Sequence, residues 1–335
     1  MRTPSKRSWL KKSFGLSVAA LAFAALAITS VGAQDLVNKS GFAGLAPPSN
    51  GSYLVPIIQH LKLDQKYGLD FDIKLYPNPD ILYSEFAAGR TAVTFGALFN
   101  GANFYVRGMP VQLLFTISTA NHAFISKLDG IHKADDLKGK TIAATTSSGF
   151  YGMASFFLKQ NKLDPRSNVN VIAASPAAVQ TQLLAGRADA GLLFDPALSN
   201  MLTQGFHLVG DMNGEIRQAL AMKPDAPVWY LGAFAYKKWI DENPKRAVAT
   251  LKMWQEAAKF YNEHPAEADK IISDFTKVPL VAMQKSRELK LTQFQVTPAI
   301  DQKDNLDALF RGFKDAGFLT AVPDAGVYYA WPKTQ

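Results

Sequence analysis

The chain has 335 residues, with 36 Lys and Arg, 28 Asp and Glu, five His and no Cys. This length fits about two domains, and 48% hydrophobic against 19% charged residues excludes a disordered chain. The absence of cysteine excludes disulfides, thiol nucleophiles, cysteine zinc sites and iron–sulfur clusters. The net charge of +8 makes nucleic acid a possible partner, so the distribution of that charge has to be examined.

The first 33 residues have the pattern of a secretory signal peptide. Five basic residues and no acidic one precede an apolar run over 14–28, and small residues follow at 31–33. The run is shorter than the roughly 20 residues of a spanning helix, so we expect cleavage after Ala33 rather than a membrane anchor. Residues 5–11 are similar to a twin-arginine motif with Lys6 in place of the first Arg, which leaves the export route open.

Removal of this segment changes the charge balance of the chain. It takes away five basic residues and leaves 31 basic against 28 acidic ones. Nucleic-acid binding therefore loses its main support, and we expect no nucleic-acid partner. No later stretch is apolar for about 18 residues. We expect a soluble mature protein in the periplasm.

The first half of the remaining chain alternates strands with helices. Strands are predicted at 42–46, 69–75, 92–95 and 111–117, the second from a clear alternation of apolar and polar residues. Between them, one helix is predicted from Tyr53 until Gly68 stops it, and another from Asn78-Pro79 to Gly89, where an N-cap precedes a proline. This alternation is typical of parallel βαβ units.

The same pattern then begins again. Strands are predicted at 141–144, 169–173, 190–194 and 206–209, and helices open at 147–149 and 175–176. Ala-Gly-Arg occurs at 88–90 and again at 185–187, each time between a helix and a strand. Two lobes with the same topology explain this repeat.

The last third predicts one strand, at 229–236, and helices opening at Asn243, Pro265 and Asp301. Helices of this kind need a sheet to pack against, and the sheet of the first lobe is the simplest choice. We therefore predict an α/β protein with residues 1–33 as signal peptide, 34–122 and 228–335 as lobe 1, and 123–227 as lobe 2.

Motifs of common enzymes are missing from the sequence. It has no phosphate-binding P-loop, no Gly-x-Gly-x-x-Gly and no Gly-x-Ser-x-Gly. The five His are scattered, without the spacing of metal ligands. We expect no enzyme, no catalytic residues, no metal and no cofactor.

Polar and aromatic residues instead follow the predicted strands, where ligands of open α/β sheets bind. Free N–H groups at helix N-termini hold anions there without Lys or Arg. The candidate ligand-binding residues are Ser49, Asn50, Ser52, Phe99, Asn100, Thr146, Ser147, Ser148, Phe150, Tyr151, Asp195 and Trp229.

Each of these residues also has a structural interpretation. Ser49, Asn50 and Ser52 are turn formers and caps, and Asp195 before Pro196 is a typical helix start. The aromatic candidates, with Tyr230 beside Trp229, fit a core as well as a cleft. His122 lies where the chain leaves the first lobe and fits a hinge better than a ligand contact.

The features that carry a family resemblance are the signal peptide, the two lobes, Lys138-Gly139-Lys140-Thr141-Ile142-Ala143, and the run from Ala185 to Ala190 followed by Phe194-Asp195-Pro196. In these features the sequence resembles bacterial ABC-transporter solute-binding proteins. The nearest group serves nitrate, sulfonates, taurine and the pyrimidine precursor of thiamine. The resemblance implies a type II periplasmic binding protein fold, with a ligand cleft between two lobes joined by two crossing strands at about 122–127 and 228–236. It implies a small-molecule ligand and delivery to an ABC permease in the inner membrane, and we expect a monomer.

Two departures qualify the resemblance. The acid usual in the first-lobe Gly-x-x-Asp is absent, because the chain reads Gly89-Arg90-Thr91-Ala92. The fungal enzymes of the group carry a Cys-rich motif, which this chain lacks. A small organic anion such as a sulfonate is the leading ligand, held by N–H groups and hydroxyls. An aromatic or pyrimidine ligand is the alternative, and an exported enzyme or a sensor module on the same fold is a further one.

Overall fold

A computed structural model describes residues 41–332 of the chain. The predicted signal peptide and its cleavage site after Ala33 lie outside these residues. Among the helices within them, none combines the length and the apolar character needed to cross a membrane.

The first lobe is built on a five-stranded mixed sheet in the order β2-β1-β3-β10-β4. β1 pairs in parallel with β2 and β3, whereas β10 lies antiparallel between β3 and β4. The last strand of the chain therefore fills an interior place in the first sheet. The strands are β1 (Phe42–Leu45), β2 (Ile73–Tyr76), β3 (Val93–Ala97), β4 (Val111–Thr119) and β10 (Trp229–Tyr236).

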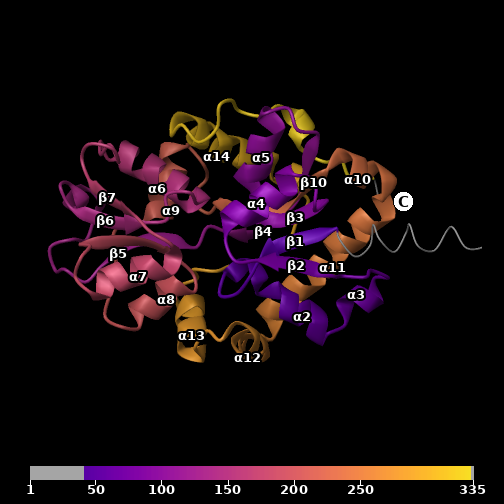
Figure 1. The fold of residues 1–335 in the computed structure, drawn as a ribbon, viewed down its shortest axis with the longest axis horizontal. Coiled ribbons are helices and arrows are strands. Elements are labelled where there is room, and N and C mark those ends of the chain that lie inside the picture. Colours follow the sequence, from indigo (N-terminus) through magenta and orange to yellow (C-terminus); the bar gives the residue numbers. More distant parts are fainter. Residues whose placement is uncertain (1–40, 333–335) are drawn as a thin grey trace, which may run out of the picture. The chain divides into compact units, whose positions relative to one another are not determined.

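Helices cover both faces of this sheet (Figure 1). Helices α4 and α5 lie on one face, and α2 and α11 lie on the other. The core between sheet and helices is aromatic, and the rings of Phe95 and Trp254 are 4.4 Å apart. The helices are α2 (Leu54–His60), α3 (Leu63–Lys66), α4 (Pro79–Ala87), α5 (Leu98–Val106), α10 (Lys237–Glu242), α11 (Pro244–Glu263), α12 (Pro265–Thr276) and α14 (Lys303–Asp315).

The second lobe has its own five-stranded sheet, in the order β7-β6-β8-β5-β9. Helices α6 and α9 cover one face, and α7 and α8 cover the other (Figure 1). The elements are β5 (His122–Ser126), β6 (Thr141–Ala144), α6 (Gly149–Gln160), β7 (Asn170–Ala173), α7 (Pro176–Leu184), β8 (Ala190–Phe194), α8 (Ala197–Leu202), β9 (His207–Leu208) and α9 (Met212–Ala219). The two-lobed α/β fold predicted from the sequence is confirmed.

The chain passes between the sheets twice, at positions that differ from those expected. It crosses first at Ala120 and Asn121, between β4 and β5, and again in the segment 220–228 between α9 and β10. The strands predicted to cross, at 122–127 and 228–236, each lie within one sheet. A strand gains ladder hydrogen bonds only inside a sheet, so the crossings are short links without regular structure.

A helix that the sequence did not predict lies against the second lobe. Helix α13 (Leu280–Glu288) packs on α8, although the segments before and after it belong with the first sheet. The segment that follows α13 returns to β4, where Phe294 bridges to Ser118 and Pro298 to Phe115. The carboxyl-terminal third therefore contacts both lobes.

Candidate functional site

Five rings from both lobes meet between the two sheets. Phe150 lies at the start of α6, with its ring centroid 3.7 Å from that of Tyr230, 4.7 Å from Phe194 and 4.8 Å from His122. Phe99, in the first turn of α5, lies 6.1 Å from Tyr230. Tyr230 and Phe99 belong to the first lobe, and Phe150 and Phe194 to the second. We call these five residues the cross-lobe stack.

The sequence around α6 explains how its N-terminus reaches the first lobe. The Ser148 hydroxyl accepts a hydrogen bond from the Tyr151 N–H and donates one to the Thr145 carbonyl, so it caps the helix. A Cβ at Gly149 would lie 1.8 Å from the Phe99 ring, so only glycine permits this approach. Ser147 is exposed, and its hydroxyl lies 3.4 Å from the carboxylate of Asp80 in α4.

The turn after β1 is held by its own serines. Ser49 accepts from the Gly51 N–H at 3.2 Å, and the Ser52 hydroxyl donates to the Ser49 carbonyl at 2.7 Å. Both serines therefore act as turn formers, the structural interpretation of the sequence. Asn50 differs, because its side-chain nitrogen is buried and has no hydrogen-bond partner within 41–332. A buried polar atom without a partner is rare in folded proteins, so Asn50 stays a predicted ligand contact.

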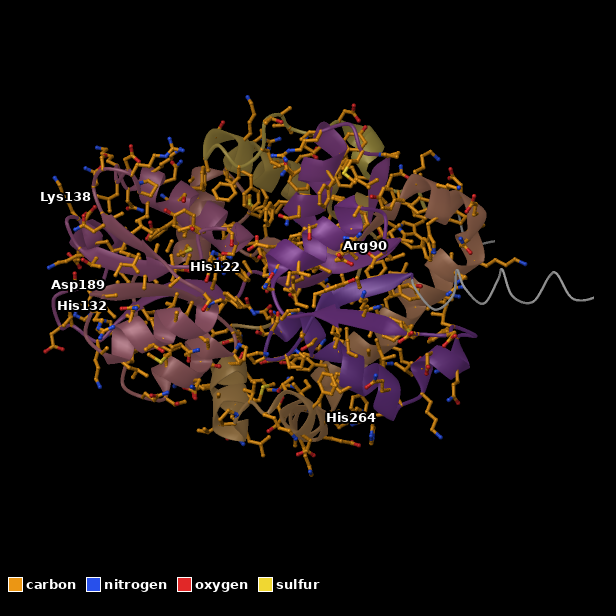
Figure 2. The ribbon with its side chains drawn as sticks, in the orientation of Figure 1. Arg90, His122, His132, Lys138, Asp189 and His264 are labelled. Carbon is orange, nitrogen blue, oxygen red and sulfur yellow. The ribbon has the colours of Figure 1, made fainter. Side chains whose placement is uncertain are left out.

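His122 is another buried polar group without a partner. Figure 2 shows it between the two sheets, and its side chain is 3% exposed. Neither ring nitrogen has a hydrogen-bond partner among the described residues. Burial lowers the pKa of His122 to about 3, so the ring is neutral at pH 7 and offers one donor and one acceptor.

Asp195 lies at the end of β8 with its carboxylate fully buried. It accepts hydrogen bonds from the Ser286 hydroxyl, from the Thr292 hydroxyl at 2.8 Å and from the Ser199 N–H at 3.2 Å. Burial raises the pKa of Asp195, while these hydrogen bonds oppose the rise. The carboxylate therefore joins α8 to the carboxyl-terminal segment, with its oxygens occupied by protein donors.

The other predicted residues lie around this region without forming one cluster. The Trp229 indole donates to the Gln302 side chain at 3.0 Å and is buried. Asn100, Thr146 and Tyr151 are half-buried. The structure thus brings Phe99 and Phe150 together, while Ser49 and Ser148 act as helix caps.

Three residues near the stack were not among the predicted ligand contacts. Tyr230 and His122 are in it, although the sequence pointed only to a core or hinge role for them. The Tyr83 hydroxyl in α4 accepts from the Ala97 N–H at 2.9 Å, and burial raises its pKa. Burial also raises the pKa of Tyr230 well above its ordinary value. The one sequence signal was the position of His122 and Tyr230 beside the two crossings.

Two α/β lobes with buried polar groups and a stack of rings between them define the class of two-lobed periplasmic binding protein folds. A family model described as NMT1/THI5 like matches residues 65–268. The chain belongs to this NMT1/THI5-like family. No curated protein matches the sequence.

Solved structures show the same fold at low sequence identity. The periplasmic aliphatic sulphonate binding protein SsuA from Escherichia coli is 16% identical, with a TM-score of 0.68 over 89% of this chain and 94% of that one. The alkanesulfonate-binding protein SsuA from Xanthomonas axonopodis pv. citri, bound to MOPS, is 17% identical, with a TM-score of 0.66 over 85% and 95%. The ligand-binding component of an ABC-type import system from Staphylococcus aureus, with zinc bound, is 14% identical, with a TM-score of 0.66 over 87% and 96%. In the part of this chain that the structure describes, no group of three or more His, Cys, Asp or Glu is placed to hold a metal.

Proposed function

We propose that the chain is the substrate-binding component of an ABC importer, which captures a small organic solute between its lobes and delivers it to a permease in the inner membrane. The observation that carries the proposal is the cross-lobe stack, where rings of both lobes meet and the buried His122 ring has no hydrogen-bond partner among the described residues. A solute held by both lobes favours their closed arrangement through differential contacts. The fold shared with the SsuA proteins supports the same role.

The rest of the proposal follows from the sequence. We propose that the protein works in the periplasm as a monomer, after cleavage behind Ala33. We also propose that 34–122 with 228–335 and 123–227 move as its two lobes. Helix α13 is the exception within 228–335, because it packs on α8 of the second lobe and in this scheme moves with that lobe.

The surroundings of the stack favour a flat ligand with a polar edge, such as an aromatic ring or a pyrimidine. Ring faces attract another ring, and a neutral His122 supplies a hydrogen-bond donor or acceptor without charge. The twelve predicted contact residues include no Lys or Arg to pair with an anion. A flat ligand would separate Phe150 from Tyr230 as the lobes open and would then lie between the two rings.

A small organic anion such as a sulfonate is the second candidate. The observation that favours it is the N-terminus of α6, where Phe150 lies against Tyr230 of the first lobe. Backbone N–H groups at this helix end, aided by the helix dipole, would donate to a sulfonate oxygen. The Asp80 carboxylate beside Ser147 opposes a negative charge at this place, so we rank the anion second.

The experiment begins with native mass spectrometry of the purified protein, to detect a bound solute. A thermal-shift screen then compares pyrimidines and aromatic acids with alkanesulfonates, because a ligand that binds the folded state raises its melting temperature. We expect pyrimidines or aromatic acids to raise it more than sulfonates. If sulfonates alone stabilise the protein, the second candidate is correct, and conversion of a ligand to a new mass would indicate an enzyme.

Two variants test the place of binding. Phe150→Leu keeps the apolar volume and removes the ring face, so we expect a ring ligand to bind roughly two- to tenfold more weakly. Phe156→Leu is the matched control, because Phe156 is buried on the same helix and has no ring contact with the cross-lobe stack. Equal affinity in the two variants would place the ligand elsewhere.

A further inference from the structure

A cavity lies beside the two crossings, away from the predicted ligand contacts. It has a volume of about 440 Å³. Its walls come from the first crossing at 119–122, the second at 224–228, the start of α9, and the segment 289–295 after α13. None of the twelve predicted contact residues lines it. We call it the hinge cavity.

Buried polar atoms without partners line the hinge cavity. Asn121 is 1% exposed, and its side-chain nitrogen donates to the Thr292 hydroxyl at 3.0 Å. Asn213 donates in the same way to the Ala120 carbonyl at 3.0 Å. These hydrogen bonds fix both amides and leave each Oδ1 without a partner among the described residues. A buried acceptor left unpaired destabilises the fold, so such atoms point to a donor supplied by a ligand.

Charged side chains of both signs complete the walls. Arg217 of α9 and Lys290 supply cations, and Asp211 and Asp225 supply carboxylates. Asp211 already accepts a hydrogen bond from the Gly214 N–H at 2.9 Å. Neither Arg217 nor Lys290 forms an ion pair with any residue of 41–332. A guanidinium in this position suits a carboxylate, which it binds through two parallel hydrogen bonds.

We propose that the hinge cavity is a second ligand site, for a small carboxylate that also carries a hydroxyl or ammonium donor. The carboxylate binds Arg217, and the hydroxyl or ammonium donates to the free oxygens of Asn121 and Asn213. The cavity volume is at the scale of small-molecule sites. Because both crossings form its walls, a ligand here also biases the angle between the lobes.

Matched probes test the two halves of this chemistry by titration calorimetry. L-malate is compared with succinate, which lacks only the hydroxyl, and L-serine with serinol, which lacks the carboxylate. We expect L-malate or L-serine to bind at least tenfold more tightly than its partner compound. Binding of neither at millimolar concentration, as for a cavity that holds water only, would overturn the proposal.

Variants then locate the bound probe. Arg217→Gln is expected to weaken binding of the better probe at least tenfold, whereas Arg187→Gln, an exposed arginine of the same lobe outside the cavity, leaves it unchanged. Phe150→Leu changes the cross-lobe stack and should also leave it unchanged. If Phe150→Leu weakens binding of the probe and Arg217→Gln does not, the probe binds at the cross-lobe stack and the hinge site is refuted. The proposed importer role would still stand in that case.

Discussion

His122 is an ionisable ring that is almost completely buried. Its pKa is about 3 in the folded protein, against an ordinary 6.5 in the unfolded chain. Between these values the unfolded chain binds a proton that the folded protein does not. The free energy of unfolding therefore falls as the pH drops from 6.5 towards 3, by up to about 1.4 kcal/mol per pH unit from this one group.

Replacement of His122 by Leu removes this titration. We expect the free energy of unfolding of the wild-type protein to lose about 1 kcal/mol more per pH unit than that of His122→Leu between pH 6 and pH 4. Urea unfolding at a series of pH values measures both slopes. Parallel pH profiles for the two proteins would show that His122 is protonated in the folded state.

A substitution of Asp195 distinguishes its two interpretations, as a structural residue at a helix start and as a ligand contact. Asp195→Ala leaves Ser286, Thr292 and Ser199 without their shared acceptor, so we expect a loss of roughly 3 kcal/mol or more in the free energy of unfolding. Asp189→Ala, at the other end of β8, removes one bond to the Thr141 N–H and should cost only about 1 kcal/mol. A stable Asp195→Ala variant that fails to bind ligand would instead make Asp195 a ligand contact.

At the scale of elements, the start of α6 combines a cap and a contact between lobes. Ser148→Ala removes the cap and should lower the free energy of unfolding by about 1 kcal/mol. Ser147→Ala removes an exposed hydroxyl and should change it by less than about 0.5 kcal/mol. Denaturant unfolding measures both. If either variant binds a sulfonate tenfold or more weakly, the start of α6 is the binding site of an anionic ligand.

Helix α13 connects the carboxyl-terminal segment to the second lobe through one buried hydroxyl. Ser286→Ala removes the hydrogen bond to Asp195, and we expect a cost of about 1.5–3 kcal/mol and faster amide exchange in α8 and α13 together. Ser273→Ala is the matched control, because its hydroxyl bonds within its own segment, to the Val278 carbonyl. Faster exchange in α13 with α8 unchanged would show that the two helices open independently.

Local sequence patterns predicted many of the helices and strands. They did not predict contacts between residues far apart in the chain. The predicted strand at 229–236 agrees with β10, and the predicted caps Asn78 and Ser175 each accept a hydrogen bond from a helix N–H. The strand predicted at 69–75 is β2 at 73–76, because β1 offers only four residues for pairing. The contact of α13 with α8 joins residues about 90 positions apart, and no periodicity encodes such a contact.

The site was harder to predict than the fold for the same reason. Strand ends identified Phe99 and Phe150, whose rings belong to the cross-lobe stack. Ser49 and Ser148 have the sequence of both a cap and an anion site, and only their hydrogen bonds show that they cap. The unpaired state of Asn50 and His122 depends on what surrounds them in space, and a sequence does not contain that information.

For the whole molecule, the cross-lobe stack predicts a change in compactness. Without ligand, water competes for the polar groups between the lobes, so we expect open forms to be populated in solution. Saturation with the ligand found by screening should reduce the radius of gyration measured by X-ray scattering. The same radius with and without ligand would contradict a clamp-like mechanism.

The interior place of β10 in the first sheet has a consequence for the order of folding. The second sheet uses one uninterrupted stretch of chain, from β5 to β9, and is complete once residue 208 has been made. The first sheet has β1 to β4 early, yet β3 and β4 have no bridge between them until β10 is added more than 100 residues later. During synthesis, the second lobe therefore forms its complete sheet before the first. Until β10 is made, β3 and β4 keep unpaired edges.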